Sequence, residues 1–274
     1  MANLSGQVSM GWQVPAFDVA EFHTRKSRYA ICLFVINEGE RVRSQLRRMA
    51  LQAAGCDVII GDGGSRDGSL EKSFLQGCGV RALLTKTGPG KLSAQMRMAL
   101  SWCLEEGYEG VIVVDGNDKD DTSAIPLFIS KLEEGYDHVQ GSRYVPGGKA
   151  VNTPWLRHWG VALLHAPLIS LAAGFRYTDT TNGFRAYSRK LLTDERVQPF
   201  RDAFMGYELH YYLAIRSARL GLAVTEVPVT RAYPAEGSIP TKISGWRGNV
   251  MILQVLARAC LHRFNPSETA QLKS

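Results

Sequence analysis

Apolar residues along the chain fall into short runs that alternate with stretches of helical periodicity. Short runs rich in β-branched residues, bounded by glycine or polar residues, predict buried strands, and apolar positions spaced three or four residues apart predict amphipathic helices. The expected strands cover residues 29–36, 57–61, 80–85, 111–114 and 137–141, and the expected helices lie around 42–53, 92–104 and 125–132. This alternation predicts an α/β fold with a mostly parallel sheet and helices on both of its faces.

The remaining segments suggest a simple domain organisation. Residues 1–27 show little periodicity and predict an N-terminal arm, residues 28–240 a single domain, and residues 241–274 a C-terminal helix and tail. Residues 154–175 are nearly all apolar after a Trp- and Arg-containing start, which fits either a buried helix or a helix at a membrane interface. The C-terminal helix is expected to dock on the sheet, pair with a second subunit in a homo-oligomer, or lie on an anionic membrane surface.

Composition narrows the choice of partner and compartment. The chain has 274 residues and 32 basic against 26 acidic side chains, a net charge of +6 that suits a nucleotide diphosphate or a lipid headgroup. No nucleic-acid partner is expected, because the basic residues form no block. The five cysteines lie far apart, which predicts a reducing compartment. With no secretion signal and no apolar run of about 20 residues, the chain is expected to be cytoplasmic, and peripheral attachment to the cytosolic membrane face stays open.

Carboxylates follow two of the expected strands directly. Asp115 ends the strand 111–114 and opens an acidic turn, and Asp62 ends the strand 57–61. Ligands of open α/β sheets bind outside the carboxyl ends of the strands, and hard oxygen ligands suit Mg²⁺ or Mn²⁺. Each turn also has an ordinary interpretation as a helix cap, with Ser65 or Asp67 capping the helix after the second strand.

Known phosphate-binding motifs do not fit. The stretch after Asp62 has Arg66 where the dinucleotide fingerprint needs its third glycine, and Lys91 is followed by Leu92 where a phosphate loop needs Ser or Thr. Lys91 and Arg97 are therefore expected either to face a diphosphate or to lie on the surface. No His/Cys spacing suggests zinc, so His165 and His210 are expected to pack or to form hydrogen bonds.

Six short motifs occur together in one order. They are Asn37-Glu38, the turn 62–69 (DGGSRDGS), Asp115-Gly116-Asn117, 141–144 (GSRY), 179–185 (DTTNGFR) and 226–229 (EVPV). Over residues 29–245 this order resembles the inverting glycosyltransferases of family 2, in the branch of dolichyl- and polyprenyl-phosphate sugar synthases. The resemblance implies a GT-A fold and transfer of a hexose from a GDP- or UDP-linked sugar to a polyprenyl phosphate.

The resemblance also implies roles for individual residues. Asp115, with Asn117 or Asp118, would hold Mg²⁺ or Mn²⁺, and Arg143 and Lys242 would neutralise phosphate charge. The nucleotide would be bound by Asn37, Glu38, Asp62, Gly64, Ser65, Asp67 and Lys91. Two features depart from the family pattern. Asn117 replaces a charged ligand, and Arg231, Tyr233 and Pro234 occupy the region where the family has paired arginines before Lys242.

The acceptor decides whether the reaction needs a base. In the reaction that the resemblance implies, an acceptor oxygen attacks the anomeric carbon while the nucleoside diphosphate leaves from the opposite face. A phosphate monoester, with a second pKa of about 6, arrives ionised, whereas an alcohol needs a general base, for which Asp179 and Glu208 are the candidates. Three alternatives remain: a soluble family 2 enzyme that glycosylates a hydroxyl of a small molecule or polysaccharide, a non-catalytic nucleotide-sugar binder, and, least favoured, a nucleotidyltransferase.

Overall fold

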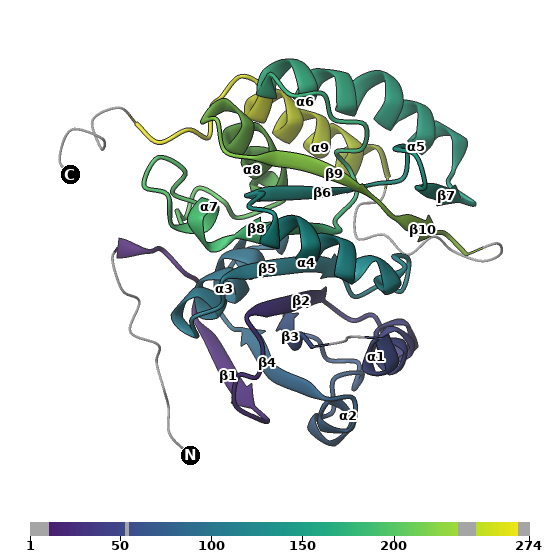
Figure 1. The fold of residues 1–274 in the computed structure, drawn as a ribbon, viewed down its shortest axis with the longest axis vertical. Coiled ribbons are helices and arrows are strands. Elements are labelled where there is room, and N and C mark those ends of the chain that lie inside the picture. Colours follow the sequence, from purple (N-terminus) through teal and green to yellow (C-terminus); the bar gives the residue numbers. More distant parts are fainter. Residues whose placement is uncertain (1–10, 53–54, 235–244, 268–274) are drawn as a thin grey trace.

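The computed structural model describes residues 11–52, 55–234 and 245–267, which form an eight-stranded mixed sheet flanked by helices (Figure 1). The strand order is β1-β4-β3-β2-β5-β8-β6-β9, and β7 and β10 form a separate pair. The strands are β1 Phe17–Glu21, β2 Tyr29–Val35, β3 Asp57–Asp62, β4 Val80–Lys86, β5 Gly110–Asp115, β6 His138–Ser142, β7 Lys149–Val151, β8 Arg185–Ser188, β9 Val224–Pro228 and β10 Thr230–Ala232. The helices are α1 Glu40–Gln52, α2 Lys72–Gly77, α3 Leu92–Glu105, the 3-10 turn η2 Thr122–Ala124, α4 Ile125–Glu133, α5 Trp155–Gly160, the π-helical turn η3 Val161–His165, α6 Ala166–Ala173, α7 Arg189–Thr193, α8 Glu208–Arg219 and α9 Gly245–Cys260.

The central strand β2 shows how the sheet is buried. All seven of its residues are buried, and successive side chains point to opposite faces because the period of a strand is two. Cys32 and Phe34 pack on one face with residues of α3, α6, α8 and α9, whereas Ile31 and Leu33 pack on the other face with residues of α1, α2 and α4. Helices therefore cover both faces, as the sequence predicts.

Strand direction places the functional edge of the sheet. Strands β2, β3, β4 and β5 are parallel, and β6 runs in the same direction because β8 is antiparallel to both β5 and β6. Asp62, Asp115 and Ser142, the last residues of β3, β5 and β6, therefore lie along one edge. The segment that leads into β8 reaches the same edge from the opposite direction.

Five strands among the described residues were not expected from the sequence, namely β1, β7, β8, β9 and β10. The first and third of these belong to the main sheet as follows. Residues 17–21, within the expected arm, form the edge strand β1 by antiparallel pairing with β4, and residues 185–188 form β8 between β5 and β6. Both segments are short and carry polar residues, so their apolar pattern is weak. Their strand character comes from the backbone hydrogen bonds that neighbouring strands offer.

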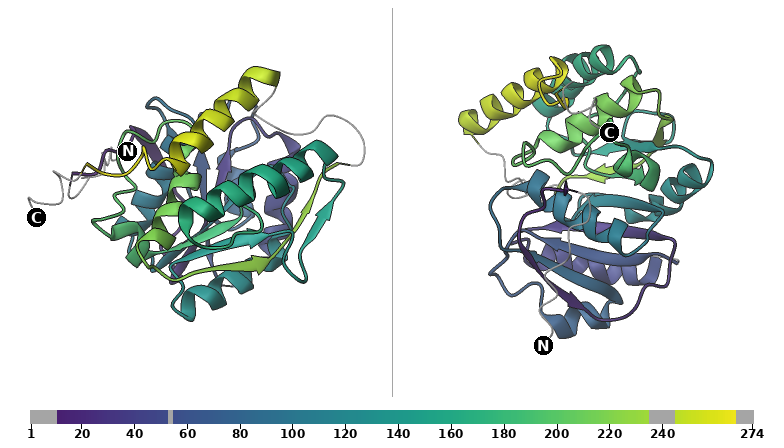
Figure 2. Two further views of the ribbon diagram at one scale, coloured as in Figure 1. Left: turned by 90° about the horizontal axis from the view of Figure 1, so that it is seen from above. Right: turned by 90° about the vertical axis from the view of Figure 1, so that its left-hand side faces the viewer.

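The apolar segment after residue 154 forms three consecutive helical stretches, α5, η3 and α6, instead of one regular helix. Gly174, with φ of +70°, ends α6 in the left-handed conformation that favours glycine. Helix α9 lies beside α6 on the outside of the molecule (Figure 2). Over the described residues, no helix combines the length and the apolar character needed to cross a bilayer.

Candidate active site

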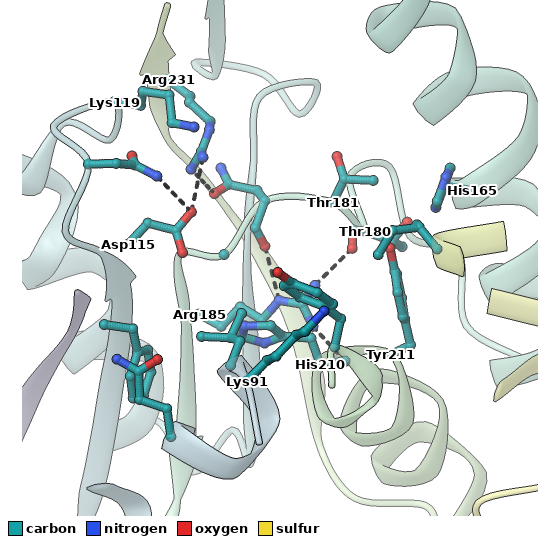
Figure 3. A pocket seen from close by; sticks show the side chains of 18 of the residues that line it. Lys91, Asp115, Lys119, His165, Thr180, Thr181, Arg185, His210, Tyr211 and Arg231 are labelled. Carbon is teal, nitrogen blue, oxygen red and sulfur yellow. Dashed lines mark hydrogen bonds and ion pairs between the residues drawn. The ribbon is translucent and has the colours of Figure 1, made fainter. Parts of the chain in front are cut away.

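A cavity of about 900 Å³ opens at the functional edge of the sheet (Figure 3). One end lies against β2, β5 and the segment before β8, where it meets Asp115, Asn182 and Gly183. The other end lies between the helical segment η3 and α9, where Val161, Leu164 and Leu253 line it. The cavity thus joins a charged end to an apolar end.

Asp115 is the sequence-predicted catalytic residue that the structure places in this cavity. Its Oδ2 accepts a hydrogen bond from Arg231 Nη2 at 3.0 Å. Gly183 lies so close that a Cβ added there would be 2.9 Å from Asp115 Oδ1. Burial would raise the pKa of this carboxyl, but the positive charges of Arg231 and Lys119 outweigh it, and the pKa lies below its usual value. Asp115 is therefore held as a carboxylate.

Arg231 and Lys119 are buried cations that line the cavity beside Asp115. Arg231 also donates from Nη1 to Asp120 Oδ2 at 2.5 Å. Burial disfavours the charged form of both side chains. For Arg231 the carboxylates of Asp120 and Asp115 overcome that cost and raise its pKa, whereas burial and the neighbouring Arg231 lower the pKa of Lys119 to about 8.

Of the three predicted metal ligands, the structure brings Asp115 and Asn117 together and separates Asp118 from them. Asn117 lines the cavity with its Nδ2 3.5 Å from Asp115 Oδ2, and its buried Oδ1 has no hydrogen-bond partner among the described residues. Asp118 instead forms an ion pair with Arg48 of α1 at 2.6 Å, because the turn directs its side chain toward that helix. Within the described residues, no three His, Cys, Asp or Glu side chains are grouped to hold a metal ion. One carboxylate paired with an arginine and one amide oxygen fit a divalent cation poorly.

The predicted nucleotide-binding residues divide into two groups. Glu38 and Lys91 line the cavity, and so does Gly63. The others, which do not line it, are Asn37, Asp62, Gly64, Ser65 and Asp67.

The residues outside the cavity hold two loops together. Asp62 accepts hydrogen bonds from the backbone N–H and the hydroxyl of Ser65, so its carboxylate closes its own turn. Ser65 Oγ accepts from the backbone N–H of Asn37, and Asp67 accepts from that of Gly39. The turn after β3 thereby fixes the loop after β2, which carries Glu38 into the cavity.

The structure separates Arg143, Asp179 and Glu208 from the cavity. Arg143 donates to both carboxylate oxygens of Asp179, at 2.6 and 2.9 Å, and both side chains are almost fully buried. Glu208 at the start of α8 accepts from the backbone N–H of Gly206 at 2.7 Å. These three side chains are engaged by one another or by the backbone, and none of them lines the cavity. Lys242 lies outside the described residues.

Several residues of the cavity had no predicted site role. Thr180 and Asn182 are fully buried and line it, and Thr180 Oγ1 and Asn182 Nδ2 have no hydrogen-bond partner among the described residues. His165 and His210 also line it, and burial together with Arg185 lowers the pKa of His210 to about 3, so its ring is neutral. Thr180 and Asn182 both belong to the motif at 179–185, so this motif was the sequence signal that could have identified them. Nothing in the local sequence marked Lys119.

Comparisons with known proteins agree with this geometry. The family model described as Glycosyl transferase family 2 matches residues 30–195. The undecaprenyl-phosphate mannosyltransferase of Micrococcus luteus is 30% identical over 200 residues, covering 71% of this chain and 79% of that protein. The polyprenol monophosphomannose synthase of Mycolicibacterium smegmatis is 26% identical over 206 residues, covering 74% of this chain and 77% of that protein.

Solved structures show the same fold. Glucosyl-3-phosphoglycerate synthase from Mycobacterium tuberculosis in complex with UDP superposes with a TM-score of 0.60 at 19% identity, covering 89% of this chain and 82% of that chain. The same enzyme with Mn²⁺, UDP and glucosyl-3-phosphoglycerate has a TM-score of 0.59 at 16% identity. Because the family model covers more than half of the chain and a 30% identical relative and the solved structures agree with it, this chain belongs to glycosyltransferase family 2 and has the GT-A fold.

Proposed function

We propose that this glycosyltransferase transfers a hexose from a GDP- or UDP-linked sugar to a polyprenyl phosphate. The observation that carries the proposal is the cavity, which runs from the charged edge at Asp115 to an apolar end at Val161, Leu164 and Leu253. A polyprenyl phosphate has the same order of parts, with a charged group at one end of an apolar chain. The names of the Micrococcus and Mycolicibacterium relatives support the same acceptor.

The buried polar atoms suit the sugar of the donor. Thr180 Oγ1, Asn182 Nδ2 and Asn117 Oδ1 are buried in the cavity without partners among the described residues. Leaving such groups unpaired costs about 1–3 kcal/mol each. Ring hydroxyls of a hexose both donate and accept hydrogen bonds, so a bound sugar would satisfy those of these groups that it reaches.

A phosphate acceptor also fits the placement of the two predicted bases. The two candidate bases are engaged elsewhere, Asp179 by Arg143 and Glu208 by the backbone of Gly206. Neither lines the cavity. An ionised phosphate oxygen attacks the anomeric carbon without losing a proton, so the reaction needs no general base. A hydroxyl acceptor would require one.

We further propose that the molecule rests on a membrane through the outer surface of η3, α6 and α9. On the first two segments Leu163, Leu164, Leu168 and Leu171 are exposed, with Leu171 at 79% and Leu163 at 70%. Their spacing places them on one side of the helical segment. This surface adjoins the apolar end of the cavity, so a lipid acceptor could enter without leaving the bilayer. In this arrangement residues 28–240 carry the transferase domain, and the segment 241–274 adds α9.

The dependence on Mg²⁺ or Mn²⁺ stays a prediction. A relative of the same fold was solved with Mn²⁺, which supports a divalent cation in such folds. In this chain the available oxygen groups are Asp115, which is paired with Arg231, and the amide of Asn117. No step proposed above uses a metal.

The proposal is tested by measuring nucleoside diphosphate release from GDP- and UDP-hexoses by the purified protein, with and without a short polyprenyl phosphate. We expect release that depends on the lipid phosphate. Asp115→Asn should abolish it, whereas Glu133→Gln on the exposed side of α4 serves as the matched control. Release of nucleoside diphosphate that does not depend on the lipid phosphate and requires a hydroxyl acceptor would overturn the assigned acceptor.

A further inference from the structure

Two positively charged side chains, Lys119 and Arg231, lie beside Asp115. Lys119 and Arg231 are only 6% and 5% exposed, and both line the cavity. Figure 3 shows the two side chains close together on the same side of Asp115. Arg231 is paired with Asp115 and Asp120, and Lys119 Nζ lies 5.3 Å from the centre of the Tyr233 ring, so both charges are held inside the protein at the wall of the cavity.

The backbone holds both cations in place. The turn 117–121 runs along β10 through hydrogen bonds from the Ala232 N–H to the Lys119 carbonyl at 2.8 Å and from the Asp121 N–H to the Thr230 carbonyl at 3.0 Å. Asp120 and Arg231 form an antiparallel bridge in the same place. Each cation therefore starts from a fixed main-chain position.

The net charge of the four side chains at this site equals that of two carboxylates with a bound divalent cation. Two carboxylates and one divalent cation sum to zero, and so do Asp115 and Asp120 with Lys119 and Arg231. The two carboxylates are already bound by Arg231, at 3.0 Å to Asp115 and 2.5 Å to Asp120. A divalent cation added there would meet two positive side chains and two carboxylates that Arg231 already engages.

We propose that Lys119 and Arg231 take the place of the divalent cation at the donor diphosphate, so that this enzyme binds its nucleotide sugar and releases the nucleoside diphosphate without metal. The inference rests on the proposed function, because it assumes a nucleotide-sugar donor in this cavity. It goes further by assigning the positive charge to side chains and by contradicting the metal prediction made from the sequence.

The reaction balances with these two groups. The bond between the anomeric carbon and the β-phosphate oxygen breaks, and its electron pair stays on that oxygen. The acceptor phosphate oxygen supplies the electron pair of the new bond to the anomeric carbon, so one negative charge passes from acceptor to leaving group. N–H groups of Lys119 and Arg231 donate hydrogen bonds to the oxygens on which this charge develops, and no proton is transferred.

The test is calorimetric binding of GDP and of UDP to the whole protein, in EDTA and with added Mg²⁺ or Mn²⁺. We expect at least one of the two nucleotides to bind in EDTA with an affinity within about tenfold of its value with metal. Lys119→Gln should weaken binding in EDTA by about tenfold or more, since the substitution removes a charged hydrogen-bond donor to the diphosphate. Lys131→Gln on α4, outside the cavity, is the matched control.

A second variant reverses the proposed arrangement. The double substitution Asn117→Asp and Lys119→Gln adds a carboxylate beside Asp115 and removes one cation, so its nucleotide binding should become dependent on Mg²⁺ or Mn²⁺. Folding of each variant is checked by its thermal transition. If a variant does not fold, the comparison of wild-type binding in EDTA and with metal decides the question.

The outcomes separate this inference from the proposed function. Wild-type binding that is lost in EDTA and restored by metal overturns the inference and leaves the proposed function intact. If a nucleotide binds in EDTA but release of nucleoside diphosphate does not depend on polyprenyl phosphate, the proposed acceptor is overturned and the inference stays intact. Binding of neither nucleotide under any condition overturns both.

Discussion

At the scale of single residues, the site depends on very close packing around one carboxylate. Asp115 was recognisable in the sequence because it directly follows a buried apolar run. The features that fix its position were not recognisable. Arg231 is 116 residues away along the chain, and Gly183 contacts the carboxylate only because the segment before β8 arrives at the end of β5.

We expect Gly183→Ala to lower turnover by about 10²-fold, because a displacement of about 1 Å at a reacting centre has an effect of this size. The added Cβ would lie 2.9 Å from Asp115 Oδ1 and push the carboxylate away from Arg231. Gly77→Ala on α2 is the control, since a Cβ there meets nothing within 4 Å. Steady-state release of nucleoside diphosphate measures the effect, and full turnover by Gly183→Ala would show that the position of Asp115 is not critical.

At the scale of elements, the apolar segment 154–175 had two interpretations, a buried helix or an interfacial helix. The structure shows features of both. Ile169 and Ala173 pack into the core, whereas Leu163 and Leu171 point away from it. The sequence could not decide, because a helix that is apolar all round carries no sign of which side meets the rest of the molecule.

The double substitution Leu163→Glu and Leu171→Glu should weaken binding to vesicles that contain anionic lipid by at least about tenfold, because each exposed leucine that enters a membrane contributes about 1.5–3 kcal/mol. Leu127→Glu on α4, which is 43% exposed on the opposite face of the sheet, should leave binding unchanged. Co-sedimentation measures both. The contrary result is a wild-type protein that fails to bind vesicles and forms a dimer that the double substitution dissociates. That result would assign this surface to a second copy of the chain.

At the scale of the whole molecule, two buried neutral histidines link stability to pH. His138 is fully buried between β8 and α8, near the Tyr177 and Ser217 hydroxyls, and burial and Arg185 hold its pKa well below the usual value. The same causes lower the pKa of His210 to about 3. Below about pH 6.5 the unfolded chain binds protons that these folded histidines do not, so acid favours unfolding.

We therefore expect the free energy of unfolding to fall as the pH is lowered from 6.5 toward 4.5, with each histidine contributing up to about 1.4 kcal/mol per pH unit. His138→Gln should make this slope shallower by up to that amount, whatever its effect on stability at neutral pH. Leu127→Gln, an exposed position without a titratable group, should leave the slope unchanged. Urea unfolding at a series of pH values gives the slopes, and identical slopes for the wild type and His138→Gln would contradict the assignment.

The sequence by itself determined the fold class, the family and the position of Asp115, since strand periodicity and short ordered motifs are local properties that survive without coordinates. The tertiary structure alone decided which polar residues share the cavity. Arg143 and Asp179 match the family motifs but neutralise each other, whereas Lys119 and Arg231 match none and lie beside Asp115. The physical reason is that a buried charge is defined by its partner, and such partners come from strands far apart in the chain.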